Sequence, residues 1–187
     1  MKRVLQIEPD TNFRFMYSVD DYDVNDWKFN GESRIGNIKR FQAQWAQDSN
    51  KPIPDISYIN TSTFAISKKV ATELVELWED SAELIPFDVN DELWYLLNVI
   101  NRQENILDVD NSEFMVPVLN VGIEKAVFYP DKLPRSCIFK IPEGRYSETF
   151  CVDSRVDDED IMNNLFCAIQ GHGYTGLIFK EVASYKV

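Results

Sequence analysis

The chain has few of the residues that build flexible linkers, zinc sites and disulfide frameworks. Its 187 residues include seven glycines, one histidine and three cysteines. Seven glycines leave little chain for flexible linkers, and a single histidine cannot supply the paired imidazoles of the common zinc sites. The cysteines, at positions 137, 151 and 167, are odd in number and form no Cys-x-x-Cys motif. The sequence therefore predicts neither a disulfide framework nor a redox pair, and it favours a reducing compartment.

Long apolar runs are also missing. No window approaches the roughly 18 uninterrupted apolar residues that a transmembrane helix requires. The first ten residues carry charges on both sides of a few apolar ones, which is too short for the hydrophobic region of a signal peptide. We therefore expect a cytoplasmic protein.

Positive charge is scarce, with 19 Lys and Arg against 31 Asp and Glu for a net charge of −12. The excess is concentrated in residues 61–120, which hold three basic and twelve acidic side chains. A field of that sign repels nucleic acid and anionic lipid, and it attracts a basic protein surface. We expect neither nucleic acid nor membrane as a partner.

The hydrophobic pattern predicts an α+β fold, mostly antiparallel sheet with two main amphipathic helices at about 67–81 and 157–170. We expect a single domain over 1–187. In it, residues 1–54 form an irregular N-terminal part that could be a subdomain, and residues 55–187 form a regular core. Short apolar runs predict strands at 3–8, 84–89, 93–100, 126–129, 138–141, 149–152 and 177–182, with a helix as the alternative for 91–101.

The first predicted helix has the clearer signals. Ser67 is a good N-cap, and Val70, Leu74, Leu77 and Trp78 recur at the spacing of one helical face. That rotation predicts a buried apolar stripe and a solvent-facing stripe of carboxylates.

Motifs of catalysis and cofactor binding are weak. Gly171–Gly176 matches G-x-G-x-x-G, but it follows a helix and precedes a strand, which is the reverse of a phosphate loop, so we interpret it as a helix cap and a turn. Asp108–Glu113 is dense in oxygen ligands yet lacks the EF-hand glycine, which favours a solvated turn over a cation site. The cysteines fit core packing better than nucleophilic catalysis. We expect no catalytic residue, no metal and no cofactor.

Apolar strand patterns and turn residues carry a resemblance over roughly residues 55–182. The segments are Ile66–Leu74, Leu84–Phe87, Tyr95–Val99, Leu107–Glu113, Ile138–Pro142, Phe150–Val152 and Tyr174–Phe179. In these segments the chain resembles the bacterial polymorphic-toxin immunity proteins first described from a myxobacterial protein. The resemblance implies a non-enzymatic cytoplasmic protein that binds and silences a cognate secreted antibacterial toxin.

The charge pattern agrees with that expectation, because a nuclease-like toxin is basic around its phosphate-binding site. The expected partner interface consists of acidic residues from the middle third: Glu73, Glu76, Asp80, Glu83, Asp88, Asp91, Glu92, Asp108, Asp110 and Glu113. The second choice is the acidic and aromatic loop of Asp20, Asp21, Tyr22, Asp23, Asp26 and Trp27. Two alternatives stay open: an acidic adaptor or chaperone-like binding module, and a carboxylate-based hydrolase.

Overall fold

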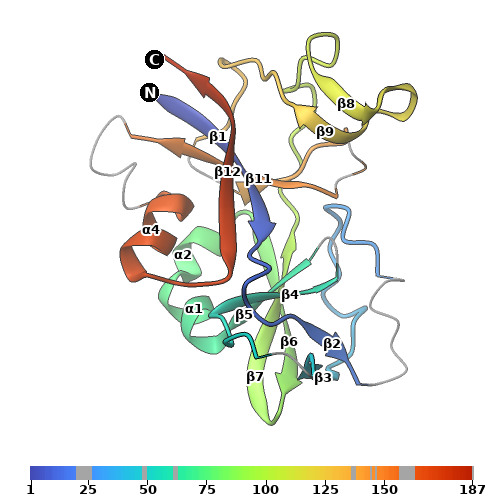
Figure 1. The fold of residues 1–187 in the computed structure, drawn as a ribbon, viewed down its shortest axis with the longest axis vertical. Coiled ribbons are helices and arrows are strands. Elements are labelled where there is room, and N and C mark those ends of the chain that lie inside the picture. Colours follow the sequence, from blue (N-terminus) through green and yellow to red (C-terminus); the bar gives the residue numbers. More distant parts are fainter. Residues whose placement is uncertain are drawn as a thin grey trace.

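Two mixed or antiparallel sheets and a separate hairpin make up the fold (Figure 1). The computed structural model describes residues 1–19, 27–47, 50–60, 63–135, 138–143, 145, 147–155 and 163–186. The smaller sheet has the strand order β10-β11-β1-β12, and the larger has the order β2-β3-β6-β7-β5-β4. Within the described chain every strand pair is antiparallel except β3 with β6. The predicted α+β class with mostly antiparallel strands is confirmed.

The bounds of the elements are as follows. The smaller sheet contains β1 (Lys2–Pro9), β10 (Ile138–Phe139), β11 (Thr149–Ser154) and β12 (Leu177–Tyr185). The larger sheet contains β2 (Met16–Ser18), β3 (Gln42–Trp45), β4 (Ile56–Asn60), β5 (Thr63–Ser67), β6 (Ala82–Val89) and β7 (Glu92–Val99). The hairpin contains β8 (Glu113–Val116), the 3-10 helix η1 (Pro117–Leu119) and β9 (Val121–Lys125). The helices are α1 (Lys68–Glu73), α2 (Val75–Trp78) and α4 (Leu165–His172).

The N-terminal segment 1–54 contributes strands to both sheets. β1 lies between β11 and β12, so the first strand of the chain pairs with the last. β3 pairs with β6, which joins the same segment to the larger sheet. The C-terminal strands β11 and β12 are not neighbours, because β1 lies between them.

The first predicted helix begins where the sequence places it and then breaks. The Ser67 side chain accepts a hydrogen bond from the backbone N–H of Val70, which confirms the N-cap. Leu74 leaves helical geometry, with φ −112° and ψ 24°, and divides the segment into α1 and α2. Val70, Leu74 and Trp78 are buried and Leu77 is partly buried, so the predicted apolar face is correct.

The structure describes only the later part of the second predicted helix. There Asn164 is an N-cap that accepts a hydrogen bond from the backbone N–H of Cys167 at 3.1 Å, and α4 covers 165–172. The positions proposed for its first turn, 157–160, lie outside the described residues. The helix ends at Gly173, which has a φ of 69°, rather than at Gly171. The glycine motif is therefore a helix cap and a turn, as its position predicts.

The two central strands of the larger sheet are β6 and β7, and they correspond to the apolar runs predicted there. β7 excludes the alternative helix over 91–101. By contrast, the predicted strand at 126–129 is reduced to one isolated bridge between Leu107 and Phe128. Within the described part of the chain no helix is long and apolar enough to cross a bilayer.

Candidate functional site

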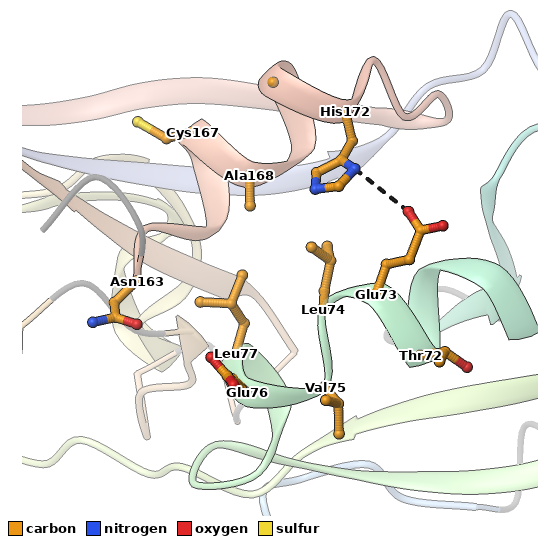
Figure 2. Close-up of a pocket in the computed structure, with 11 residues that line it drawn as sticks. Thr72, Glu73, Leu74, Val75, Glu76, Leu77, Asn163, Cys167, Ala168 and His172 are labelled. Carbon is orange, nitrogen blue, oxygen red and sulfur yellow. Dashed lines mark ion pairs between the residues drawn. The ribbon is translucent and has the colours of Figure 1, made fainter. Parts of the chain in front are cut away.

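A groove between the α1–α2 segment and α4 collects two of the predicted interface carboxylates. It has a volume of about 580 Å³, and Figure 2 shows its two walls. Leu74, Leu77 and Ala168 supply apolar surface. The polar lining includes Glu73 and Glu76 from the α1–α2 side and His172 from the end of α4. The groove thus combines an apolar lining with carboxylates.

Glu73 connects the two walls of the groove. Its Oε2 accepts a hydrogen bond from the Tyr174 hydroxyl and lies 3.4 Å from His172 Nδ1, which makes an ion pair when the imidazole is protonated (Figure 2). The rings of His172 and Tyr174 stack with centroids 5.1 Å apart, and Lys69 Nζ lies 5.3 Å from the Tyr174 ring centroid. Burial and the neighbouring Glu73 carboxylate raise the pKa of Tyr174 well above its ordinary value. Tyr174 is therefore a neutral donor that holds Glu73 in place.

The loop that carries Tyr174 is fixed by the backbone. The Tyr174 N–H donates to the carbonyl of Ile169 at 3.1 Å, which closes the end of α4. The next residue, Thr175, donates to Asp55 Oδ2 from both its N–H at 3.0 Å and its hydroxyl at 2.8 Å. Gly176 then approaches β4 so closely that a Cβ there would lie 1.7 Å from the carbonyl oxygen of Ile56. One end of the groove is consequently rigid.

Among the described residues that line the groove, no thiol contacts an imidazole. Cys167 lines the groove, but its sulfur points away from His172 (Figure 2). Cysteine catalysis needs the base within hydrogen-bonding reach of the thiol. Cys151 is fully buried, as the core-packing interpretation predicts, and Cys137 lies outside the described residues.

Two of the predicted interface residues have other roles. Glu83 lies on β6, not on the helix, and is only 8% exposed; its Oε2 accepts hydrogen bonds from the Arg34 N–H at 2.8 Å and from Asn98 Nδ2 at 3.0 Å. Burial alone would raise the pKa of Glu83, but these donors outweigh it and lower the pKa. Asp88 accepts hydrogen bonds from Arg40 Nε at 2.7 Å and from Arg40 Nη2, and these lower the pKa of the carboxyl. The prediction that Glu83 is a solvent-facing interface residue is wrong, and Asp88 already has an internal cationic partner.

The other predicted interface residues occupy three separate places (Figure 1). Asp80 is exposed after α2, close in sequence to the two groove carboxylates. Asp91 and Glu92 are exposed at the turn from β6 to β7. Asp108, Asp110 and Glu113 lead into β8, where Asp108 accepts hydrogen bonds from the backbone and side-chain amides of Asn111. That pattern is the solvated turn expected from the sequence.

The second-choice loop is described only at its end. Asp20, Asp21, Tyr22, Asp23 and Asp26 lie outside the described residues. Trp27 is partly buried and packs edge-on against Phe41 at a centroid distance of 5.1 Å, so it is a core contact rather than a projecting anchor.

Protein-family models give no match to the chain, and neither do curated proteins. Among the described residues, no group of three His, Cys, Asp or Glu side chains is arranged to hold a metal ion.

Three residues at or near the groove were not predicted as site residues: His172, which lines it, Tyr174, which contacts Glu73, and the nearby Glu79. Glu79 is exposed beside Asp80 and was left out of the predicted interface although its spacing from Glu76 matches the helical face. His172 and Tyr174 were interpreted only as parts of a cap and turn. Their contact with Glu73 spans about a hundred positions, so no local signal indicated it.

Proposed function

We propose that the chain is an immunity-type inhibitor that binds a basic protein toxin and covers its working surface. The observation that carries this proposal is the groove between α1–α2 and α4, where Glu73 and Glu76 lie beside Leu74 and Leu77. An apolar lining with anionic groups suits an amphipathic, positively charged protein segment. The chemistry is that of binding, and we propose no catalytic step.

The charge of the surrounding surface supports the same partner. Glu76, Glu79 and Asp80 are exposed along α2 and the turn that follows it. Like charges this close repel one another in the free protein, and a basic partner relieves that repulsion. Long-range attraction between opposite charges mainly speeds encounter, so the association rate should fall as salt rises.

The toxin as partner follows from the family resemblance, whereas an acidic adaptor or chaperone-like module would use the same surface for another basic protein.

A carboxylate-based hydrolase needs a protonated carboxyl acid beside a second carboxylate. Among the described residues, the carboxyls of Glu83, Asp88 and Asp153 have lowered pKa values, which makes them anions at neutral pH rather than acids. This favours binding over hydrolysis.

The test measures association with the purified product of the gene adjacent to this one, over a range of salt concentrations. The groove variant is Glu73→Gln with Glu76→Gln, which removes two charges while keeping the shape of both side chains. The matched control is Asp91→Asn with Glu92→Gln, which removes two exposed charges at the β6–β7 turn. We expect the groove variant to associate at least about tenfold more slowly at low salt and to lose most of its salt dependence.

Equal association rates and equal salt dependence for the groove variant and the unmodified protein would remove the groove from the interface. No binding of the adjacent-gene product by the unmodified protein would overturn the immunity function itself. Binding of many unrelated basic proteins with similar affinity would support the adaptor instead.

A further inference from the structure

The hairpin of β8, η1 and β9 ends in an exposed apolar tip. The tip consists of Met115, Val116, Val118 and Leu119, with exposed fractions of 67%, 43%, 94% and 58%. Figure 1 shows the hairpin at the far end of the molecule from the β6–β7 turn. Burying apolar surface is favourable, and clustered exposed apolar side chains mark interaction sites. Packing within this chain does not account for the exposure of these four apolar side chains.

The hairpin is fixed in place at its base. Phe114 and Ile123 face each other across the two strands and are each 7% exposed, in the core cluster that includes Phe128 and Phe150. The opposite face therefore points away from that core. The antiparallel pairing of β8 with β9 aligns the strands up to Val116 and Val121.

The tip also has a defined shape. Pro117 opens η1, and the N–H of Asn120, in the left-handed region with a φ of 49°, closes it on the carbonyl of Pro117 at 3.3 Å. Met115 lies against Gly122, where a Cβ would come within 2.3 Å of the methionine methyl. A side chain held in its bound shape loses less entropy on association, so a preformed tip is a better anchor than a flexible loop.

Carboxylates flank the tip on both sides in the sequence. Residues 108–125 contain four acidic side chains and one lysine. Asp110, Glu113 and Glu124 are exposed, and the lysine, Lys125, is paired with Glu113 at an Nζ–Oε1 distance of 3.2 Å. An apolar centre with a charged rim is the usual anatomy of a protein interface.

The negative charge of these carboxylates indicates which kind of partner the tip can bind. An anionic membrane surface would be repelled by the rim, and a second copy of this chain would bring the same negative charge to it. A protein with an apolar cavity inside a basic rim satisfies both the tip and the carboxylates.

We propose that the hairpin tip inserts into an apolar cavity of the basic protein partner and anchors it, as a contact additional to the groove. This inference rests on the proposed function, because it takes the same toxin as the occupant. The groove then contributes mainly to the rate of encounter, and the tip contributes mainly to the lifetime of the complex.

The test compares dissociation rates of the complex with the adjacent-gene product. The variant is Val118→Ser with Leu119→Ser, which removes apolar surface without adding charge. Both positions are exposed, so the variant keeps its fold, which circular dichroism and the unfolding midpoint verify. Ile35→Ser and Ile53→Ser are the matched controls, since they are 65% and 54% exposed and lie elsewhere.

We expect the tip variant to dissociate about 100-fold faster, with the association rate within about threefold of the unmodified protein. The controls should leave both rates unchanged. Amide hydrogen exchange at residues 113–125 should slow in the complex of the unmodified protein.

Four outcomes would overturn the inference. A dissociation rate unchanged in the tip variant, with binding otherwise intact, removes the tip from the interface and leaves the proposed function standing. If the free unmodified protein self-associates and the tip variant does not, the tip belongs to a contact with a second copy. If the unmodified protein binds neutral phosphatidylcholine vesicles and the tip variant does not, the tip belongs to a membrane contact. Failure of the unmodified protein to bind the adjacent-gene product overturns the proposed function, and the inference with it.

Discussion

The Tyr174 hydroxyl donates a hydrogen bond to the Glu73 carboxylate and so ties the end of α4 to the end of α1. The two residues are 101 positions apart. Their contact makes one end of the groove a fixed structure in which the carboxylate has a set direction. Removing this hydrogen bond should therefore also change the geometry of that end of the groove.

Tyr174→Phe should lower the free energy of unfolding by about 1 kcal/mol, since Glu73 is partly exposed and water replaces the lost donor. The pKa of Tyr174 is raised in the folded state, so the unfolded chain ionises first. The stabilising effect is present below the ordinary tyrosine pKa of 10.0 and declines as the pH rises beyond it. In an ultraviolet titration that follows phenolate formation, Tyr174→Phe should have one fewer tyrosine that ionises at high pH than the unmodified protein. The exposed Tyr129→Phe serves as the control, and a late-ionising fraction equal in the two variants would contradict the assignment.

Because Lys140 is buried, we expect the free energy of unfolding to rise with pH. Lys140 is 1% exposed, donates from Nζ to the carbonyl of Phe29 at 2.8 Å, and has its pKa lowered by burial to about 8 from 10.5, against a smaller opposing effect of Glu148. Between those two values the unfolded chain binds more protons than the folded one, so the free energy of unfolding increases with pH. We expect a gain of about 2–3 kcal/mol between pH 8 and about pH 10. Urea unfolding at a series of pH values measures it.

Lys140→Met is the control for that measurement, because it keeps an apolar stem of similar length and cannot titrate. Its stability should be nearly flat over the same range. A rise as steep as that of the unmodified protein would assign the effect to another group.

The apolar face of α1–α2 is tested by two truncations. Leu74 is 5% exposed and belongs to the core cluster between the sheets and helices, so Leu74→Ala should lower the free energy of unfolding by about 2–4 kcal/mol. Leu77 is only partly buried, and Leu77→Ala should cost about half as much. Denaturant unfolding compares the two, and a loss below about 0.5 kcal/mol for Leu74→Ala would contradict its burial in the core.

The buried Asp153 should make the smaller sheet lose stability in acid. Its side chain is 2% exposed and accepts from Arg3 Nε at 2.8 Å, Arg155 Nε at 2.9 Å and Asn164 Nδ2 at 2.8 Å. Burial would raise its pKa, but these three donors outweigh burial and lower the pKa below 3.8. The stabilisation is therefore complete above that value and is lost as the pH falls through the folded-state pKa.

Asp153→Asn should cost about 2–4 kcal/mol at neutral pH, because it leaves the two guanidinium groups without their shared carboxylate. It should also flatten the loss of stability in acid. Glu181→Gln is the matched control, since it removes the exposed second carboxylate of Arg3, at 3.4 Å, and should change stability by less than about 1 kcal/mol. Acid unfolding curves that coincide for Asp153→Asn and the unmodified protein would count against this account.

Local patterns in the sequence determined several elements correctly. The cap at Ser67, the inward face of Val70 and Trp78, and the strands β6 and β7 all depend on residues within a few positions of one another. Helix capping and side-chain periodicity act at that range, so the sequence alone determines them. The same holds for the interpretation of the glycine motif as a cap and turn, which Gly173 confirms.

The tertiary structure alone decided how distant segments meet. β1 lies between β11 and β12, Glu83 turns inward to Asn98 and the Arg34 N–H, and Tyr174 reaches Glu73. Each contact depends on which surfaces become neighbours when the whole chain packs, and the pairing of strands far apart in sequence leaves no local pattern. The sequence therefore determined that the middle third is acidic, whereas packing decided which of its carboxylates remain at the surface. It did so because a buried carboxylate is tolerated only where the fold supplies hydrogen-bond donors to it.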